Sequence, residues 1–200
     1  VNGAYDMYGY GETVTLLGFT SRWWHVQIRE YTGFVPADGS ALDQRTGNYY
    51  DGYATAQVHN PISTDRLNLR AEKTANSASL GKYYNGCTVA IVQKGNDGWS
   101  RVRIGNLEGY MKNQFLDFNA PKDQQTELLP KVTIQNPNGQ GANLRRQAST
   151  RVNAVALYPN GTQVRVLGIA GEWCHVLIDG EIGFMMTQYL VPRLSFESTR

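Results

Sequence analysis

Residues 161–178 read GTQVRVLGIAGEWCHVLI, a turn glycine followed by two short alternating segments, the second of which has the form Trp-x-x-Val-x-Ile. The same pattern occurs as GETVTLLGFTSRWWHVQI in residues 11–28 and as GCTVAIVQKGNDGWSRVRI in residues 86–104. The glycines that open successive copies are 75 residues apart. Self-similarity at a fixed period is the signature of a repeated structural unit, so the sequence predicts three tandem modules.

The similarity continues on both sides of this pattern. A Gly-aromatic-apolar tripeptide follows it in every copy, at residues 33–35, 109–111 and 183–185. An Asn-Leu-Arg tripeptide precedes it in copies two and three, at residues 68–70 and 143–145, but the matching position of copy one falls before the first residue. We therefore expect copy one to lack its opening strand.

These matches divide the chain into three modules and two connections. A complete module holds about 60 residues, which is near the lower limit at which a single apolar core is stable by itself. The second connection is polar enough to act as a tether, although the modules could equally pack side by side as a rigid rod. The predicted segments are repeat 1 at residues 1–43, a linker at 44–53, repeat 2 at 54–118, a linker at 119–129, repeat 3 at 130–193 and a tail at 194–200.

The composition indicates strands and tight turns. The chain contains 21 glycines and 12 tyrosines, and it has no long amphipathic helical stretch. The Asn-Gly pairs at residues 85–86 and 160–161 favour turns that require positive φ. About five short strands per module, joined by such turns, can only close as a small barrel or as two packed sheets. The predicted fold class is therefore all-β.

Strand alternation predicts which side chains face inward at the end of copy three. Cys174 and the valine and isoleucine that follow it at intervals of two share the inner face, whereas Trp173 and His175 share the outer face. We expect Cys174 to be a small buried residue, and a disulfide to Cys87 is not expected because it would join two modules. The Cys174 thiol cannot reach the adjacent imidazole, so no catalytic residues are predicted.

Charge and residue spacing argue against several functions. The chain has 19 Lys and Arg against 17 Asp and Glu, a net charge of +2 without a basic stripe, so nucleic-acid binding is not expected. No apolar run approaches the ~20 residues that a membrane-spanning helix needs. The three histidines lack metal-ligand spacing, and we expect no metal site and no cofactor.

The ordered motifs resemble those of the bacterial SH3-like domain. The Asn-Leu-Arg opening, the Asn-Gly turn and the two strands after it occur in the order of that family, and residues 114–116 and 188–190 fit its closing 3₁₀ turn and last strand. Copy one departs from this pattern at residues 40–42. The resemblance implies tandem small SH3-like β-barrels in a bacterial protein that is extracellular or associated with the cell surface.

The resemblance also implies a non-catalytic module that binds cell-wall peptidoglycan or an associated polymer, through a glycan strand or a stem peptide. Outward aromatic side chains at a shallow groove suit a sugar ring or a peptide, because they give contact area at low entropic cost. The candidate ligand-binding residues at the repeated positions are Trp23, Trp99 and Trp173, then His25, Arg101 and His175, and finally Tyr8, Tyr83 and Tyr158.

Other interpretations of these residues remain open. Each tryptophan could instead cover one end of a barrel, and each histidine could be an ordinary surface residue. The chain could then be a structural or protein-interaction array that binds a surface protein, with its aromatic residues buried against neighbouring modules. It could also be the targeting part of a larger cell-wall hydrolase. Solvent exposure of the repeated tryptophans and tyrosines distinguishes the first two functions.

Overall fold

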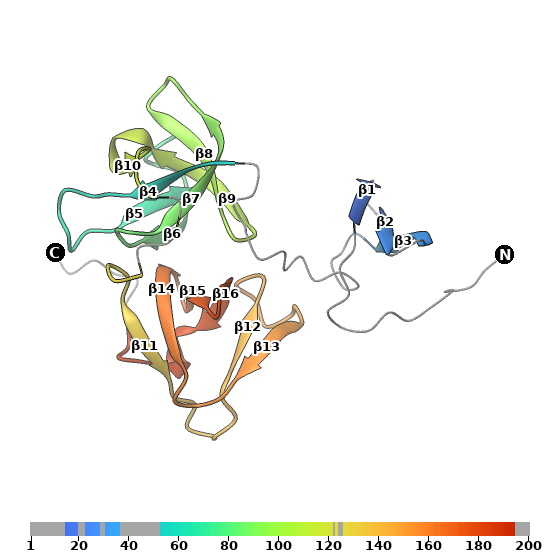
Figure 1. Ribbon diagram of the computed structural model, residues 1–200. Coiled ribbons are helices and arrows are strands. Elements are labelled where there is room, and N and C mark those ends of the chain that lie inside the picture. Colours follow the sequence, from blue (N-terminus) through green and yellow to red (C-terminus); the bar gives the residue numbers. More distant parts are fainter. Residues whose placement is uncertain are drawn as a thin grey trace. The chain divides into compact units, whose positions relative to one another are not determined.

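The computed structural model describes residues 15–19, 23–28, 31–36, 53–121, 123 and 126–194 (Figure 1). The chain divides into two compact units, Val1–Arg45 and Thr46–Arg200. Every regular element within the described residues is a β-strand or a three-residue 3₁₀ turn. The prediction of an all-β fold is therefore confirmed.

The first unit contains a three-stranded antiparallel sheet. β2 lies between β1 and β3, and a bulge between Leu16 and Gly18 interrupts the pairing of β1 with β2. The predictions about Tyr8, the closing residues of repeat 1 and the first linker up to residue 52 lie outside the described residues. The strands are β1 (Thr15–Phe19), β2 (Trp23–Ile28) and β3 (Tyr31–Pro36).

The second unit begins with a group of strands that we call the second barrel, residues 54–117. The strands follow the order β10-β4-β7-β8-β9-β5-β6 and surround one apolar core (Figure 1). The elements are β4 (Ala54–Val58), β5 (Leu67–Arg70), β6 (Ser79–Tyr83), β7 (Thr88–Lys94), β8 (Trp99–Ile104), β9 (Leu107–Lys112), the 3₁₀ turn η1 (Asn113–Phe115) and β10 (Leu116–Asp117).

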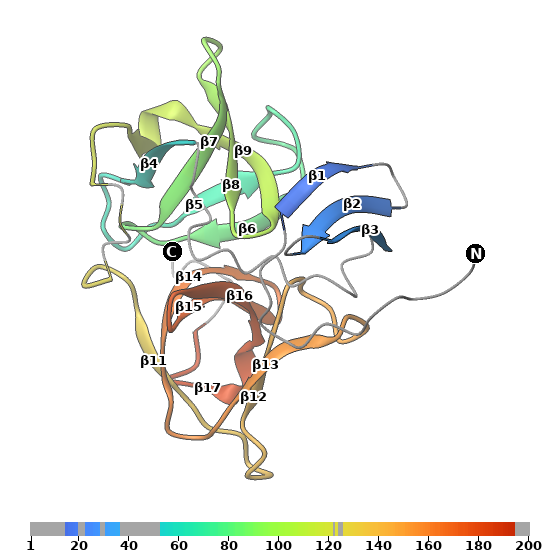
Figure 2. The ribbon, with the colours of Figure 1, turned by 45° about the vertical axis from the view of Figure 1, so that its right-hand side comes forward.

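The third barrel, residues 131–191, repeats this arrangement around a core of its own (Figure 2). β11 pairs with both β14 and β17, and the order β14-β15-β16-β12-β13 completes the set. The elements are β11 (Lys131–Ile134), β12 (Ala142–Arg145), β13 (Ala154–Tyr158), β14 (Gln163–Ala170), β15 (Trp173–Ile178), β16 (Glu181–Met186), the 3₁₀ turn η2 (Thr187–Tyr189) and β17 (Leu190–Val191).

Two Asn-Pro pairs, at residues 60–61 and 136–137, are hydrogen-bonded to the Asn-Gly pairs at residues 85–86 and 160–161. In the second barrel the Asn60 N–H donates to Asn85 Oδ1 at 2.7 Å, and Asn85 Nδ2 donates to the Asn60 carbonyl at 2.9 Å. Asn136 and Asn160 form the same two bonds in the third barrel, at 2.8 and 2.9 Å. Gly86 follows with a φ of 86°, which glycine adopts without steric cost. These bonds therefore hold the Asn-Pro pair near the start of each of these two barrels against the Asn-Gly turn.

In the second and third barrels, the glycine of the Gly-aromatic-apolar strand allows two strands to approach closely. A Cβ on Gly109 would lie 2.7 Å from the carbonyl oxygen of Arg70, and a Cβ on Gly183 would lie 2.8 Å from that of Arg145. Both distances are shorter than real Cβ contacts. The crossing of this strand over the Asn-Leu-Arg strand thus requires glycine.

The second and third barrels are joined directly. β6 pairs with β14, with Tyr83 opposite Gly168, and the Tyr84 N–H donates to the Leu167 carbonyl at 2.9 Å. Leu167 and Ile182 of the third barrel are buried within the core cluster of the second. These two modules therefore pack side by side through backbone pairing and shared apolar contacts.

The segment predicted as the second linker is held against the second barrel where it is described. Gln57 Nε2 donates to the carbonyl oxygens of Pro121 and Asp123, at 3.1 and 2.7 Å. Leu129, at the end of this segment, is buried in the core of the second barrel. Polar composition did not indicate these contacts, because backbone carbonyls accept hydrogen bonds whatever their side chains are.

Candidate functional site

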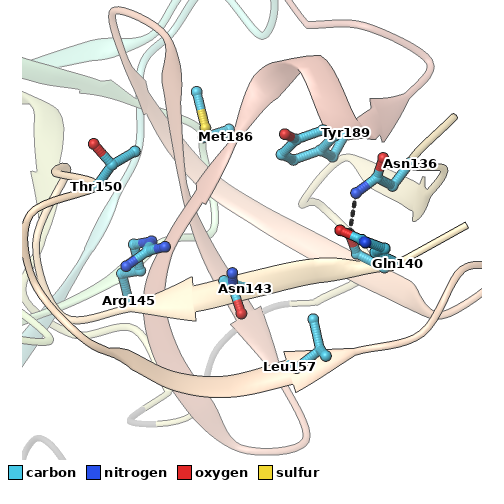
Figure 3. A pocket seen from close by; sticks show the side chains of 9 residues that line it. Asn136, Gln140, Asn143, Arg145, Thr150, Leu157, Met186 and Tyr189 are labelled. Atoms are coloured by element: carbon cyan, nitrogen blue, oxygen red, sulfur yellow. Dashed lines mark hydrogen bonds between the residues drawn. The ribbon is translucent and has the colours of Figure 1, made fainter. Parts of the chain in front are cut away.

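An open groove of about 480 Å³ lies on the third barrel (Figure 3). Its volume is within the range of small-molecule sites. β12 and β13 contribute one side of the groove, and the end of β16 with η2 contributes another. The lining residues are Asn136, Gln140, Gly141, Asn143, Arg145, Thr150, Leu157, Met186 and Tyr189.

The groove presents polar and apolar groups together. Asn143 and Leu157 are directly opposite each other on β12 and β13, and both are exposed. Asn136 Nδ2 donates to the Gly141 carbonyl at 2.7 Å and fixes the turn at the end of the groove (Figure 3). Tyr189 adds an aromatic ring that is partly exposed. This lining suits a ligand with both hydroxyl or amide groups and apolar faces.

Arg145 is the cationic residue of the groove lining. Its Nη1 donates to the carbonyl oxygen of Val152, which holds the loop after β12, and Arg70 Nη1 bonds Ser77 in the same way at 2.7 Å. These arginines therefore hold loop carbonyls. A guanidinium has five N–H donors, so Arg145 can hold this loop and still bind a carboxylate in the groove.

The candidate residues Trp99 and Trp173 are half-buried at equivalent positions of the two barrels. Trp173 lies directly opposite Met186, and opposite residues of antiparallel strands project from the same face of the sheet. Met186 lines the groove, so Trp173 lies on the same face of the sheet as a groove residue. In the second barrel, Lys112 Nζ lies 5.6 Å from the centre of the Trp99 ring. Both rings have part of their surface available to a ligand.

Arg101 is exposed but takes part in an ion pair. Its Nη2 lies 2.6 Å from Glu108 Oε2, and Arg103 pairs with the other oxygen of the same carboxylate. Burial opposes ionisation of Glu108, but the two arginines outweigh it and lower the pKa of the carboxyl. Arg101 therefore presents a guanidinium that is already partly neutralised.

The structure corrects the predicted surface position of Tyr83 and His175. Both side chains are 1% exposed. The alternation was right, because His175 does share a face with Trp173, but the second barrel covers the centre of that face. The Tyr83 hydroxyl and His175 Nδ1 are 2.9 Å apart, and the imidazole stacks on Phe184 with 4.2 Å between ring centres. Neither side chain is accessible to a ligand.

His175 is buried as a neutral imidazole. Removal from water lowers its pKa to about 3, because the charged form loses its hydration. Its Nε2 is buried, and no described residue forms a hydrogen bond with it. Protonation of His175 therefore destabilises the interface between the second and third barrels.

Acid is expected to destabilise this interface through His175. The unfolded chain binds a proton near pH 6.5 and the folded chain near pH 3, so stability is complete above pH 6.5 and declines as the pH falls towards 3. Between pH 7 and pH 5 the wild type should lose about 2 kcal/mol more than His175→Asn. Urea unfolding at both values measures this difference, and equal losses in the two proteins would contradict it.

The remaining candidates differ in how far the structure describes them. Tyr158 is half-buried against the core of the third barrel, and His25 is half-buried with its ring stacked on Phe34 at 4.7 Å. Trp23 opens β2, but its side chain is outside the described residues, as is all of Tyr8. Within the second and third barrels, the structure does not bring the candidates together into one site; these candidates are Tyr83, Trp99, Arg101, Tyr158, Trp173 and His175.

The cysteines are two buried free thiols. Burial raises the pKa of Cys174 to about 12 and raises that of Cys87 further, so neither is a thiolate at neutral pH. Within the described ranges, no three His, Cys, Asp or Glu side chains are grouped to hold a metal ion. The same ranges contain no helix that is long and apolar enough to cross a membrane.

Comparison with known families identifies part of this fold. Residues 65–117 match the model of the bacterial SH3 domain. This match covers β5 to β10 and makes the second barrel a bacterial SH3 domain.

Two curated proteins are similar to longer parts of the chain. A Bacillus subtilis (strain 168) protein named as an N-acetylmuramoyl-L-alanine amidase, YrvJ, is 22% identical over 179 residues, which are 84% of this chain and 34% of the relative. The mouse SH3 and PX domain-containing protein 2B is 27% identical over 122 residues, 61% of this chain and 12% of the relative. The chain thus spans about a third or less of either relative.

Solved structures give weaker similarities. NlpC2 from Trichomonas vaginalis matches 70% of this chain and 48% of its own, with 18% identity and a TM-score of 0.33. A Listeria monocytogenes protein named as an autolysin matches 84% of this chain and 74% of its own, with 15% identity and a TM-score of 0.24.

Proposed function

We propose that the chain is a non-catalytic binding module of three tandem SH3-like repeats that attaches to bacterial cell-wall peptidoglycan or to an associated polymer. Repeat 1 corresponds to the β1–β3 sheet, whose strand pairing matches that of the two barrels residue for residue. In this proposal the protein acts outside the cell or at its surface, without a cofactor.

The groove of the third barrel is the observation that carries this proposal. It combines an arginine, three exposed polar side chains and a tyrosine along one open surface, and Trp173 lies opposite Met186, which is one of its lining residues. A stem peptide bears carboxylates that Arg145 can bind, and a sugar ring can lie against Tyr189. An open groove accepts a segment of a long polymer, because both ends of the segment can leave it.

The Bacillus subtilis relative supports the same ligand class. A protein named as an amidase of N-acetylmuramoyl-L-alanine acts on wall material, and this chain resembles only about a third of it. The remainder of such a protein has room for a catalytic domain. The chain is then the part that holds a hydrolase on its substrate, which is the third function that the sequence left open.

One observation favours a second candidate function, an array that binds protein. Tyr83 and His175 are buried between the second and third barrels, as that alternative expects for the repeated aromatic residues. Trp99 and Trp173 keep part of their surface exposed and do not follow this expectation. The burial therefore accounts for the junction between the barrels, and the groove stays open for a ligand.

Binding to insoluble peptidoglycan tests the proposal. The double variant Asn143→Ala/Leu157→Ala removes two exposed side chains of the groove without removing a hydrogen bond that the structure shows. We expect the double variant to bind peptidoglycan about tenfold more weakly than the wild type, a loss of about 1.4 kcal/mol. The fraction of protein that sediments with peptidoglycan measures this difference.

A matched variant controls for the loss of surface side chains. Ile62→Ala/Asn76→Ala makes the same kind of change at exposed positions of the second barrel, away from the groove, and should bind like the wild type. Peptidoglycan with and without its attached polymers separates the two ligand classes. Absence of wild-type binding to either preparation would refute the proposal and favour the protein-binding array.

A further inference from the structure

The sheet of copy one reproduces a constellation of the third barrel. In both, a leucine bulges before a glycine that lies opposite a histidine, and the histidine lies opposite a phenylalanine. The rings stack in both places, with centres 4.7 Å apart in copy one and 4.2 Å apart in the third barrel. The equivalent residues are Leu17, Gly18, His25 and Phe34 in copy one and Leu167, Gly168, His175 and Phe184 in the third barrel.

In the third barrel this face is covered by an edge strand. The backbone of β6 pairs with β14 beside Gly168, where a Cβ would lie 2.7 Å from the Tyr83 ring and 2.8 Å from the Lys82 carbonyl oxygen. The Tyr83 hydroxyl reaches the histidine. Leu167 is consequently 0% exposed and Phe184 3%. The constellation is thus a receptor for the edge of a tyrosine-bearing strand.

In copy one the same face is open. Leu17 is 46% exposed and Phe34 is 67% exposed, although their equivalents are buried. The second barrel has Gln93 and Arg101 in place of the glycine and the histidine, so it lacks this receptor. Two exposed apolar side chains around a glycine that fits an incoming strand indicate a docking surface.

β13 of the third barrel is the described strand that corresponds to β6. It is the last strand in the order of its sheet, and Tyr158 occupies the position of Tyr83. Ala156 stands where β6 has Gly81. A Cβ at Gly81 would lie 3.2 Å from the Tyr83 ring and 3.4 Å from the Ile169 carbonyl oxygen, so an alanine requires shifts of only tenths of an ångström.

The adjoining turn provides chemical complementarity. In the observed junction Gly105 lies against the third barrel, and a Cβ there would be 2.8 Å from Ile182 and 3.3 Å from His175 Nε2. The third barrel has Asp179 at this turn position, exposed and already at a positive φ of 49°. Copy one has the polar Thr32 in place of Ile182. A carboxylate would therefore meet a hydroxyl and an imidazole.

We propose that the chain associates head to tail, with the face around Gly18 and Phe34 of one copy docked on β13 and the Asp179 turn of a second copy. Pro159 stands at the position of Tyr84 and has no N–H, so this contact has one backbone hydrogen bond fewer than the junction between the barrels. It is also intermolecular. Association is expected at micromolar to millimolar concentrations, and such a heterologous contact closes into rings or extends as filaments.

Changes of charge on the two sides of the contact test the proposal by sedimentation velocity on the full chain. Thr32→Glu places a carboxylate against Asp179, and Asp179→Lys removes the attraction for His25; both positions are exposed, so folding should persist. Each single variant should raise the dissociation constant about tenfold or more. The double variant Thr32→Glu/Asp179→Lys should recover association to within about threefold of wild type.

A matched control and three outcomes decide the question. Thr64→Glu makes the same change at an exposed threonine of the second barrel, outside β13 and the Asp179 turn, and it should associate like wild type. A wild type that remains monomeric to millimolar concentration would overturn the proposal, because the face around Gly18 and Phe34 would then not dock on a second copy. Association unaffected by the single variants, or no recovery in the double variant, would also overturn it.

Discussion

Replacing Gly168 with valine is expected to separate the second barrel from the third. The new Cβ would lie 2.7 Å from Cδ1 of Tyr83 and 2.8 Å from the carbonyl oxygen of Lys82, and the second of these atoms belongs to backbone that is fixed by strand pairing. β6 and β14 must then move apart. Leu167 and Ile182, buried at this junction, would become exposed to water. We expect a loss of about 3 kcal/mol or more in the free energy of unfolding.

Thermal unfolding and imidazole titration detect this separation. The wild type should unfold in one transition, and Gly168→Val should unfold in two because each barrel has its own core. The pKa of His175 should rise from about 3 towards its ordinary value as its ring meets water. Gly81→Ala is the control, because its Cβ would be no closer than 3.2 Å to an atom at the same junction. A single transition with an unchanged His175 in Gly168→Val would refute the interpretation.

Local patterns in the sequence predicted the strands and their faces. Cys174 and Val176 are buried and Trp173 is on the opposite face, because successive side chains of any strand alternate. The Asn-Gly turns occur where they were expected, at Gly86 and Gly161, both at positive φ. These features depend on residues that are close in the chain, so the sequence alone contains the information.

The burial of His175 depends on a residue 92 positions away, Tyr83, and on a backbone approach that only Gly168 permits. No periodic pattern reports such a pair. One difference between the copies does bear on this burial. Copies one and three have a glycine opposite a histidine, and copy two has neither residue at these positions. This combination distinguishes faces that receive a strand edge from one that cannot, but neither the spacing nor the alternation of apolar residues points to it.

The repeated motifs supply only part of the groove lining, including Asn143 and Arg145. Gln140 and Thr150 come from segments that differ between the copies, and Met186 and Tyr189 are brought to them by the closing turn of the barrel. Tyr189 belongs to a closing motif that the sequence did show. Its role in the lining follows only from the way β16 and η2 return past β12, which is a property of the complete fold.

Gly141→Ala is expected to be the most damaging single substitution at the groove. Gly141 has a φ of 74°, and a Cβ there would lie 2.1 Å from the carbonyl oxygen of Tyr158, far inside any real contact. The start of β12 would have to move away from β13, and Asn136 would lose the carbonyl that fixes its side chain. We expect a loss of more than about 3 kcal/mol in unfolding free energy together with the loss of peptidoglycan binding.

Gly139→Ala isolates the steric part of this effect. Gly139 has nearly the same φ, 75°, but a Cβ there would have no atom within 4 Å. Alanine at positive φ therefore lowers the free energy of unfolding of both variants by about 1 kcal/mol. The free energy of unfolding of Gly141→Ala is lowered further by the steric overlap with Tyr158. Urea unfolding of the two variants should thus differ by about 2 kcal/mol or more. Equal midpoints would show that β12 and β13 can separate freely, and the groove would then be too pliable to hold a ligand in one position.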